Sequence, residues 1–258
     1  MKNTAIDQAR KHQQWNEYCC ILAEDGHDSL DATCFAFDRL FNGIDFDGKR
    51  VLEIGSGKGL MSLFACISGA KDVISLEPEL DGSRSQVSQI QRERALELGL
   101  HNVKVLKADF NEWQNEDEQF DIVMCLSTVN HLHESPYNAN SNKNTFLSYL
   151  EIAEKIRSML RPSGVAIITD ACRYGIFWFL KKYGFKPPWS EKPVSIDWRI
   201  HQNPRTWKRI FLSSGFPEVN IFYPLPYRLR HYKYLVANPI VNYFLLSSFC
   251  LHCHNTST

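Results

Sequence analysis

Five short, almost wholly apolar runs alternate with helical stretches after residue 49, and this alternation limits the possible folds more than any other feature of the chain. Runs this short and this apolar are typical of parallel strands covered on both faces. Leu60–Ser68 is apolar on all sides, which suits a buried helix, and a second helical segment, Phe146–Leu160, stops at the breaker Arg161-Pro162-Ser163-Gly164. The pattern predicts a doubly wound α/β sheet whose first five strands are Arg50–Ile54, Val73–Leu76, Val103–Leu106, Phe120–Cys125 and Val165–Thr169.

Outside this core the pattern changes. Residues 5–42 mix charges with spaced apolar positions and predict two helices. Tyr174 to Trp198 holds eight aromatic residues and interrupts the alternation as an insertion, and a helix at Pro204–Ser213 and strands at Val219–Tyr223 and Ser248–His252 then complete the chain. We expect one domain over residues 1–258, made of N-terminal helices (1–48), a core (49–172), an insertion (173–203) and a C-terminal part (204–258).

Composition narrows the class of protein. The 258 residues carry 29 Lys+Arg and 29 Asp+Glu, and 44% are hydrophobic, which excludes a disordered chain, a collagen-like repeat and a bundle of membrane spans. The zero net charge hides an asymmetry, because residues 1–170 hold 17 Lys+Arg and 26 Asp+Glu (net −9) while residues 171–258 hold 12 and 3 (net +9). The basic part indicates an anionic partner, unless the two ends differ only by accident of surface composition. The N-terminus shows no apolar leader and the eight cysteines suit a reducing compartment, so we expect a cytoplasmic protein.

The run Glu53-Ile54-Gly55-Ser56-Gly57-Lys58-Gly59 stands where the first strand passes into the first core helix, and glycines there let a ligand approach the backbone. A nucleoside-triphosphate loop needs a hydroxyl residue where Gly59 stands, which excludes that ligand. A dinucleotide fingerprint needs a third glycine where Leu60 stands, and the acid at Glu53 would face a pyrophosphate unfavourably. The pattern acid-x-Gly-x-Gly-x-Gly resembles instead the first motif of class I S-adenosylmethionine-dependent methyltransferases.

The resemblance covers nearly the whole chain and weakens before residue 40 and between residues 171 and 203. It implies a seven-stranded, mostly parallel sheet with an antiparallel last strand, and S-adenosyl-L-methionine as the cofactor. It also implies that Glu53 suits the ligand's ammonium group, that Glu77 holds the ribose hydroxyls, and that Asp109 and Phe110 hold the adenine. The cofactor-binding residues expected in full are Glu53, Gly55, Ser56, Gly57, Gly59, Glu77, Pro78, Asp109, Phe110 and Leu126.

The methyl acceptor is expected beyond the carboxyl ends of the fourth and fifth strands. His131 is the first candidate for a catalytic base, because an imidazole titrates near neutral pH, and His201 is the second. The alternatives are that His131 only packs and that the loop around His201 only caps the next helix. The residues expected to bind substrate are Asn130, Arg173, Trp178, Asp197, Trp198 and Gln202. No metal is expected, because Cys250-Leu251-His252-Cys253-His254 is interpreted as a final strand and tail.

The function that these features predict is methyl transfer to a small or medium-sized metabolite, at oxygen rather than nitrogen, with an anionic, sugar or lipid-linked acceptor in view. Residues 175–189 interleave aromatics with lysines, which predicts a lid over the acceptor and also fits peripheral contact with an anionic membrane. No stable nucleic-acid partner is expected. Two alternatives stay open: a nucleic-acid-modifying methyltransferase, and a non-catalytic subunit that binds the cofactor and regulates a partner.

Overall fold

The computed structural model describes residues 4–27, 29–79, 86–114, 119–176 and 199–256 of the chain. Its seven strands form one sheet in the order β3-β2-β1-β4-β5-β7-β6. β1 pairs in parallel with β2 and β4, β2 pairs in parallel with β3, and β6 pairs antiparallel with β7, which confirms the predicted sheet. The strands are β1 (Arg50–Ile54), β2 (Asp72–Leu76), β3 (Val103–Leu106), β4 (Phe120–Leu126), β5 (Leu160–Ala171), β6 (Glu218–Phe222) and β7 (Ser248–Asn255).

The chain divides into two compact units. Unit 1 comprises residues 1–126 and 159–165, and unit 2 comprises residues 127–158 and 166–258. β5 therefore contributes its first half to unit 1 and its second half to unit 2. The candidate functional residues occur in both units.

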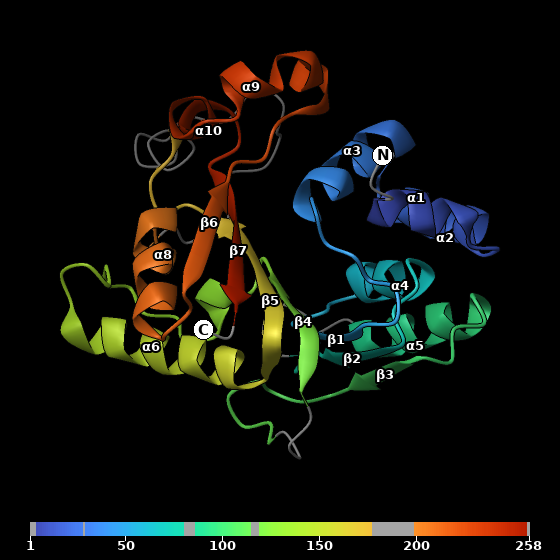
Figure 1. Cartoon of the computed structure of the whole chain (residues 1–258), viewed down its shortest axis with the longest axis horizontal. Helices are drawn as coiled ribbons and strands as arrows, with labels where there is room; N and C mark the ends of the chain where they lie inside the picture. Colours follow the sequence, from blue (N-terminus) through green and yellow to red (C-terminus); the bar gives the residue numbers. More distant parts are fainter. Residues whose placement is uncertain (1–3, 28, 80–85, 115–118, 177–198, 257–258) are drawn as a thin grey trace. The chain divides into compact units, whose positions relative to one another are not determined.

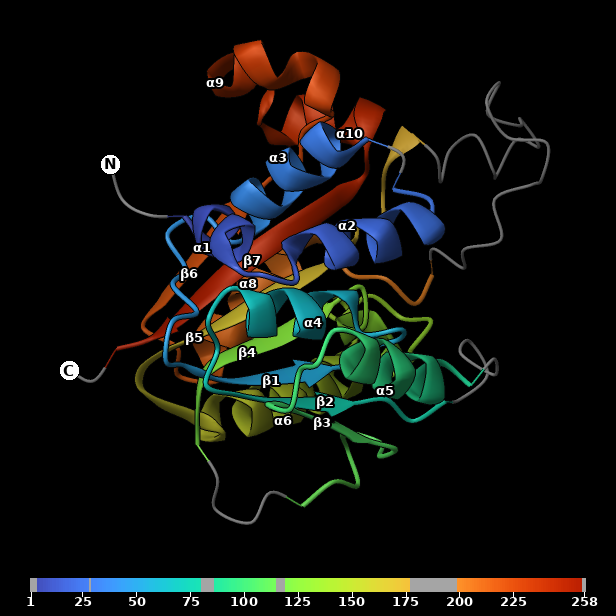
Figure 2. The same ribbon diagram turned by 90° about the vertical axis from the view of Figure 1, so that its right-hand side faces the viewer.

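In unit 1, helices cover one face of the strands β1 to β3. Figure 2 shows α4 above these strands, with α1 and α2 above α4, and α5 contacts β3. Aromatic rings fill the space between the N-terminal helices and α4, with Phe37 at 4.9 Å and Phe41 at 5.4 Å from the ring centre of Phe64. The helices of this unit are α1 (Ala5–Lys11), α2 (Trp15–Glu24), α3 (Leu30–Leu40), α4 (Leu60–Ile67) and α5 (Val87–Glu97).

In unit 2, α6 and α8 pack side by side, and α8 also contacts β6 and β7 (Figure 1). The contact between the two helices is made by fully buried side chains, with the rings of Tyr149 and Trp207 4.7 Å apart. A helical segment joins β6 to β7. The helices in the described part of this unit are η1 (Val129–His131), α6 (Lys143–Ser158), α8 (Pro204–Ser213), η2 (Tyr227–Tyr232), α9 (Lys233–Val236) and α10 (Pro239–Leu245).

The structure corrects two details of the sequence-based expectation. Residues 5–42 form three helices rather than two, because His12 takes an extended backbone after α1 and Ser29 caps a new helix by accepting a hydrogen bond from the Ala32 amide. Arg161–Gly164 is part of β5 rather than a break before it. The Arg161 side chain pairs with Asp121 at 3.1 Å, and a Cβ on Gly164 would lie 3.1 Å from the Asp121 carbonyl, so this stretch runs close against β4.

None of the described helices combines the length and the hydropathy needed to cross a bilayer.

Candidate functional site

The glycine turn between β1 and α4 is tied to the end of β2. The amides of Gly55 and Ser56 both donate to the carbonyl of Leu76, at 2.8 and 3.1 Å. Gly57 and Gly59 have positive φ angles of 52° and 78°, a conformation that other L-residues adopt only with strain. The turn is thereby held at the carboxyl end of the parallel strands, where ligands bind in open α/β sheets.

Gly57 and Gly59 differ in what surrounds them. A Cβ on Gly59 would lie 2.2 Å from the Gln91 side chain of α5, so this glycine permits close helix packing. Among the residues that the structure describes, none has an atom within 4 Å of a Cβ placed on Gly57. This part of the chain therefore leaves the backbone at Gly57 open to a ligand.

Glu77, directly after β2, faces the same turn. Its Oε2 accepts a hydrogen bond from the Gly57 amide at 2.7 Å, and its Oε1 accepts one from the Glu79 amide at 3.0 Å. The side chain is buried, so the carboxylate is fixed in direction. Each oxygen has a second lone pair, so the pair of oxygens can still accept two hydroxyl groups of a ligand.

Glu53, in contrast, lies beneath the turn. Its Oε2 accepts a hydrogen bond from Ser62 of α4, which also contacts Ser75, and Gln91 then joins Ser75 to Ser56 of the turn. Burial raises the pKa of Glu53 to about 8, and the hydrogen bonds from Ser62 oppose that rise only in part. The residue is thus mainly a neutral acid at pH 7 that supports the turn from its buried side.

Lys58 is held by an acid that the sequence did not single out. Asp25, at the end of α2, accepts from Lys58 Nζ at 2.7 Å and from both terminal nitrogens of Arg94 at 2.7 and 2.9 Å. Arg94 and Lys58 together lower the pKa of Asp25 to about 2. This ion cluster joins the N-terminal helices to the glycine turn and to α5, and no local pattern around Asp25 predicts it.

The remaining residues predicted to bind the cofactor follow the ends of the strands. Pro78 follows β2, Asp109 follows β3, and Leu126 is the last residue of β4, and all three are half-buried. The Asp109 carboxylate accepts from the amide of Asn111 at 2.7 Å. The ring of Phe110 is buried. Unit 1 therefore brings the predicted cofactor residues to one edge of its strands.

In unit 2, a buried network surrounds Asp170 at the end of β5. Its Oδ2 accepts from the Asn130 amide at 3.1 Å, and its Oδ1 lies 3.6 Å from His201 Nε2. Burial raises the pKa of Asp170, although the nearby His201 opposes the rise. Asn130 Oδ1 accepts from the Gln202 amide at 3.0 Å and from Trp207 Nε1 at 3.2 Å, while its buried Nδ2 has no hydrogen-bond partner among the described residues.

Two predicted substrate-binding residues hold loops together. Gln202 accepts from the Ala139 amide and donates to the Tyr137 carbonyl, both at 3.0 Å. Arg173 donates to the carbonyls of Pro136, at 2.8 Å, and of Arg199. The side chains of Gln202 and Arg173 therefore make hydrogen bonds to loops of unit 2 itself.

His131, at the end of η1, is the more accessible of the two predicted catalytic histidines. Its Nδ1 lies 2.8 Å from Glu134 Oε1, its side chain is 49% exposed, and its ring meets the His201 ring edge-on at 6.0 Å. Glu134 was not predicted, although a carboxylate three residues after a histidine is a usable signal. A carboxylate on Nδ1 selects the tautomer whose Nε2 can accept a proton.

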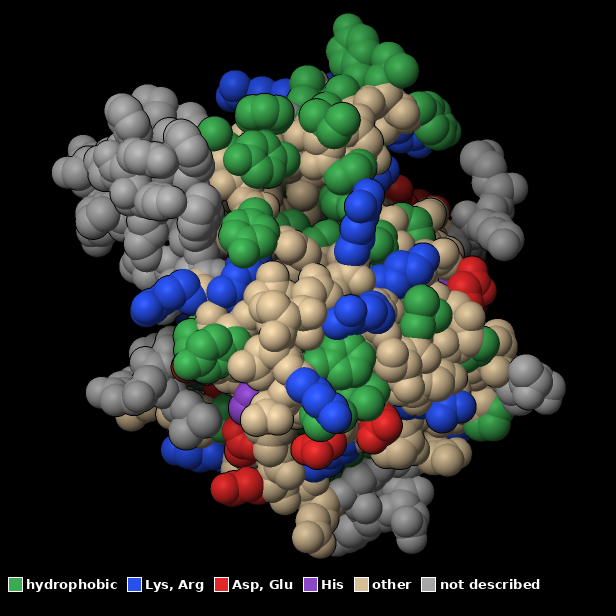
Figure 3. All heavy atoms as spheres, turned by 90° about the vertical axis from the view of Figure 1, so that its left-hand side faces the viewer, with side chains coloured by type: hydrophobic (Ala, Val, Ile, Leu, Met, Phe, Trp, Pro, Cys, Tyr) green, Lys and Arg blue, Asp and Glu red, His purple; other side chains and the backbone are tan. Residues whose placement is uncertain are grey.

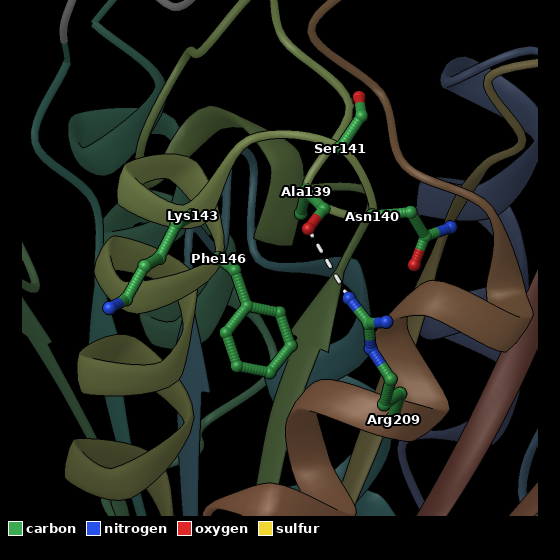
Figure 4. A pocket seen from close by; sticks show the side chains of 6 residues that line it. All are labelled: Ala139, Asn140, Ser141, Lys143, Phe146 and Arg209. Atoms are coloured by element: carbon green, nitrogen blue, oxygen red, sulfur yellow. Dashed lines mark hydrogen bonds between the residues drawn. The ribbon is translucent and has the colours of Figure 1, made fainter.

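An open pocket of about 490 Å³ lies between the start of α6 and α8 (Figure 4). Arg209 reaches across it, donating to the Ala139 carbonyl at 3.3 Å, and its guanidinium lies 4.7 Å from the centre of the Phe146 ring. None of the predicted site residues lines this pocket.

Three of the predicted substrate-binding residues, Trp178, Asp197 and Trp198, lie outside the described residues. Most of the predicted lid and membrane-contact segment 175–189 does too.

Comparison with known proteins identifies relatives of the chain. A methyltransferase-domain family model matches residues 30–251. Ribosomal protein L11 methyltransferase of Prochlorococcus marinus (strain MIT 9215) is 35% identical over 103 residues, which cover 39% of this chain and 32% of that protein. Ubiquinone biosynthesis O-methyltransferase of Pasteurella multocida (strain Pm70) is 26% identical over 142 residues, which cover 52% of this chain and 50% of that protein. The match therefore spans about a third to a half of these curated relatives.

The fold is also found among solved structures. The plantazolicin methyltransferase BpumL, in complex with S-adenosylhomocysteine (SAH), superposes with a TM-score of 0.56 at 11% identity, over 99% of this chain and 95% of that one.

Proposed function

The chain belongs to the class I S-adenosylmethionine-dependent methyltransferases, and on that premise we propose that it methylates a small or medium-sized metabolite, with oxygen as the favoured acceptor atom. One observation carries the cofactor part of the proposal: the Gly57 amide donates to the Glu77 carboxylate at 2.7 Å, and no atom of the described residues lies within 4 Å of a Cβ placed on Gly57. A ligand with two vicinal hydroxyls, such as a ribose, suits a fixed carboxylate next to exposed glycine backbone.

The residues of unit 1 fit the cofactor. Glu77 would hold the ribose, Gly57 would allow the chain to approach the ligand, and Asp109 with Phe110 would hold the adenine. When bound, the cofactor supplies a methyl carbon activated by a positively charged sulfur. Glu53 acts through the turn as a positioning residue, because its carboxyl group is buried against Ser62. Asp25 holds the Lys58 ammonium, which keeps one more cation from a cationic ligand.

The His131–Glu134 pair supports oxygen as the acceptor atom. A hydroxyl must lose its proton as it is methylated, and a positioned base assists that loss. Glu134 at His131 Nδ1 leaves Nε2 to take the proton, while half of the imidazole remains accessible. The buried Asp170–His201 pair and Asn130 hold the loop that carries His131, since Asp170 accepts from the Asn130 amide. The similarity to ubiquinone biosynthesis O-methyltransferase also favours oxygen.

A protein acceptor is the second candidate. A stretch of 103 residues is 35% identical to ribosomal protein L11 methyltransferases, whose names give a protein as the acceptor. A long basic polypeptide would, however, be repelled by the net +9 of residues 171–258, which favours a neutral or anionic acceptor.

The test is a cell extract incubated with the protein and with S-adenosylmethionine that carries a tritiated methyl group. We expect label in the small-molecule fraction. Label in a protein band would overturn the metabolite proposal in favour of the second candidate. Absence of label in every fraction, with cofactor binding intact in calorimetry, would make the chain a non-catalytic subunit.

Variants sharpen this test. Gly57→Val and Glu77→Ala are expected to lose cofactor binding, whereas Asp72→Ala, at the opposite end of β2, should retain it. His131→Ala should bind cofactor normally and lower the labelling rate about a hundredfold or more, the usual effect of removing a general base. His101→Ala, an exposed histidine of unit 1, is the matched control. Unchanged labelling by His131→Ala would remove it as the base.

A further inference from the structure

The connection between β6 and β7 is longer than its geometry requires. The two strands are antiparallel, and Phe222 pairs with Cys250, so their ends lie side by side. A hairpin of a few residues would join them. Residues 223–247 instead form η2, α9 and α10. The need to join the two strands therefore does not explain an insertion of this length.

This insertion exposes an unusual amount of apolar surface. Among the described residues, seven of the thirteen exposed large apolar side chains lie between residues 232 and 246. Tyr234 is 91% exposed, Leu235 75% and Ile240 72%. Figure 3 shows the hydrophobic side chains gathered over α9 and α10 at the top of the view. We name this the β6–β7 surface, comprising Tyr232, Tyr234, Leu235, Ile240, Tyr243 and Phe244.

The insertion is anchored on its inner side, so the outward side chains are held in place. Asn238 caps α10 by accepting from the amides of Ile240 and Val241 at 3.0 and 3.1 Å. Asn242 is buried, and its carbonyl accepts from the Ser247 amide. The Ser247 carbonyl in turn accepts from the Cys172 amide at 2.7 Å, next to the end of β5. On α10, Ile240 and Phe244 are four residues apart and therefore share one face.

The charged side chains of the insertion have one sign. No aspartate or glutamate occurs from residue 219 to residue 258, while Arg228, Arg230 and Lys233 lie in the insertion itself. Two of these cations pack on neighbouring rings, Arg230 at 4.2 Å from the centre of Tyr227 and Lys233 at 5.1 Å from that of Tyr234. Basic residues beside exposed tyrosines, phenylalanine and leucine match the chemistry of an anionic lipid interface, where polar ring tips face the headgroups.

We propose that the β6–β7 surface binds peripherally to a membrane that contains anionic phospholipid. The apolar side chains enter the boundary between headgroups and acyl chains, and the three cations lie against the lipid charges. The helices are too short to span the bilayer, so the contact is peripheral. This surface is distinct from the segment 175–189 predicted from the sequence. The proposal stands independently of the acceptor's identity.

The test is sedimentation of the full chain with vesicles of phosphatidylcholine alone or of phosphatidylcholine and phosphatidylglycerol in equal amounts. We expect the wild-type protein to sediment with the anionic vesicles at least tenfold more strongly than with the neutral ones, and added salt to release it. Failure to bind anionic vesicles, or equal binding to both kinds, would overturn the proposal.

Paired variants distinguish binding through the β6–β7 surface from nonspecific hydrophobic binding to vesicles. Leu235→Ser with Phe244→Ser should weaken vesicle binding about tenfold or more, since both side chains are exposed and their loss should leave the fold intact. Leu96→Ser with Leu212→Ser, which removes exposed leucines from α5 and α8, is the control and should bind as the wild type does. Arg228→Glu with Lys233→Glu should abolish the preference for anionic vesicles, whereas Lys71→Glu with Lys104→Glu should not.

Light scattering tests whether the β6–β7 surface binds a second copy of the chain instead of a membrane. A dimer of the wild type that the Leu235→Ser/Phe244→Ser variant loses, without vesicle binding by either, would make the surface an interface between copies and overturn the lipid proposal. A wild-type protein that stays monomeric and sediments with anionic vesicles supports it.

Discussion

Gly57 and Gly59 lie two residues apart in the same turn, and the sequence motif requires glycine at both positions. Their surroundings are different, because Gly59 makes room for Gln91 of α5, whereas a Cβ on Gly57 would meet no atom of the described residues within 4 Å. At the residue scale the motif therefore needs one glycine so that a helix can pack closely and the other so that a ligand can approach the backbone. Only the position of α5, a segment more than 25 residues further along the chain, distinguishes the two.

Glu53 gives a prediction for pH dependence at the same scale. Its pKa of about 8 in the folded chain, against an ordinary value of 4.5, means that the folded state binds the proton more tightly than the unfolded state. Stability must then fall as pH rises from the ordinary value towards 8. Between about pH 6 and about pH 9 the wild type should lose about 3 kcal/mol of unfolding free energy through this group, and Glu53→Gln, which stays neutral, should not show that loss.

Urea unfolding at several pH values measures this difference. Glu97→Gln, an exposed acid of α5, is the control and should follow the wild-type pH dependence. Parallel curves for the wild type and Glu53→Gln would show that the Glu53 carboxyl is not desolvated in the folded chain.

At the scale of elements, the N-terminal helices are joined to the cofactor half by one carboxylate. Asp25 pairs with Arg94, whose side chain is only 10% exposed, and with Lys58 of the turn. Asp25→Asn would remove the close counter-charge of the nearly buried Arg94 and leave it only the exposed Glu24, 4.0 Å away, which costs about 3 kcal/mol of unfolding free energy. It would also free the Lys58 ammonium beside the glycine turn, so weaker binding of the cationic cofactor is expected as well.

Chemical denaturation and calorimetry measure the two effects. Glu24→Gln provides the matched control, because Glu24 is 70% exposed and its carboxylate lies as far as 4.0 Å from Arg94. We expect this substitution to change the unfolding free energy by less than about 0.5 kcal/mol. Equal stability of Asp25→Asn and Glu24→Gln would contradict the role given to the cluster.

Element boundaries were predictable where the signal is local. The residues of β1, β3 and α8 agree with the bounds expected from apolar runs and from the Pro204 start signal. The run Arg161–Gly164 was misjudged because Pro and Gly usually mark a turn, whereas here Arg161 pairs with Asp121 on the neighbouring strand. A pairing between residues 40 positions apart leaves no mark in a local pattern.

At the scale of the whole molecule, the two units carry different parts of the proposed function. The glycine turn and Glu77 belong to unit 1, and the His131, Asp170 and His201 groups belong to unit 2. We expect saturating SAH to slow hydrogen exchange of the Gly55–Gly59 and Glu77 amides, because a bound ligand suppresses local opening where it contacts the chain. Amides of β7 that exchange by local opening should be unaffected.

Mass spectrometry of deuterated peptides measures this protection, with Gly57→Val as the variant that should show none. Protection confined to Ser248–Asn255 would place the ligand on the wrong unit and contradict the assignment of the glycine turn.

The sequence by itself determined the alternation of strands and helices after residue 49, the glycine turn with its acids, and the family, because these depend on apolar periodicity and on short motifs that are local in the chain. The tertiary structure decided that Glu53 supports the turn, that Asp25 holds Lys58, and that Gln202 and Arg173 serve the loops of unit 2. It also decided that the β6–β7 insertion faces outward. The first three results depend on which residues, distant in the chain, come within hydrogen-bonding distance, and the last depends on which surface stays uncovered. Both are set by the packing of the whole chain, which no local pattern records.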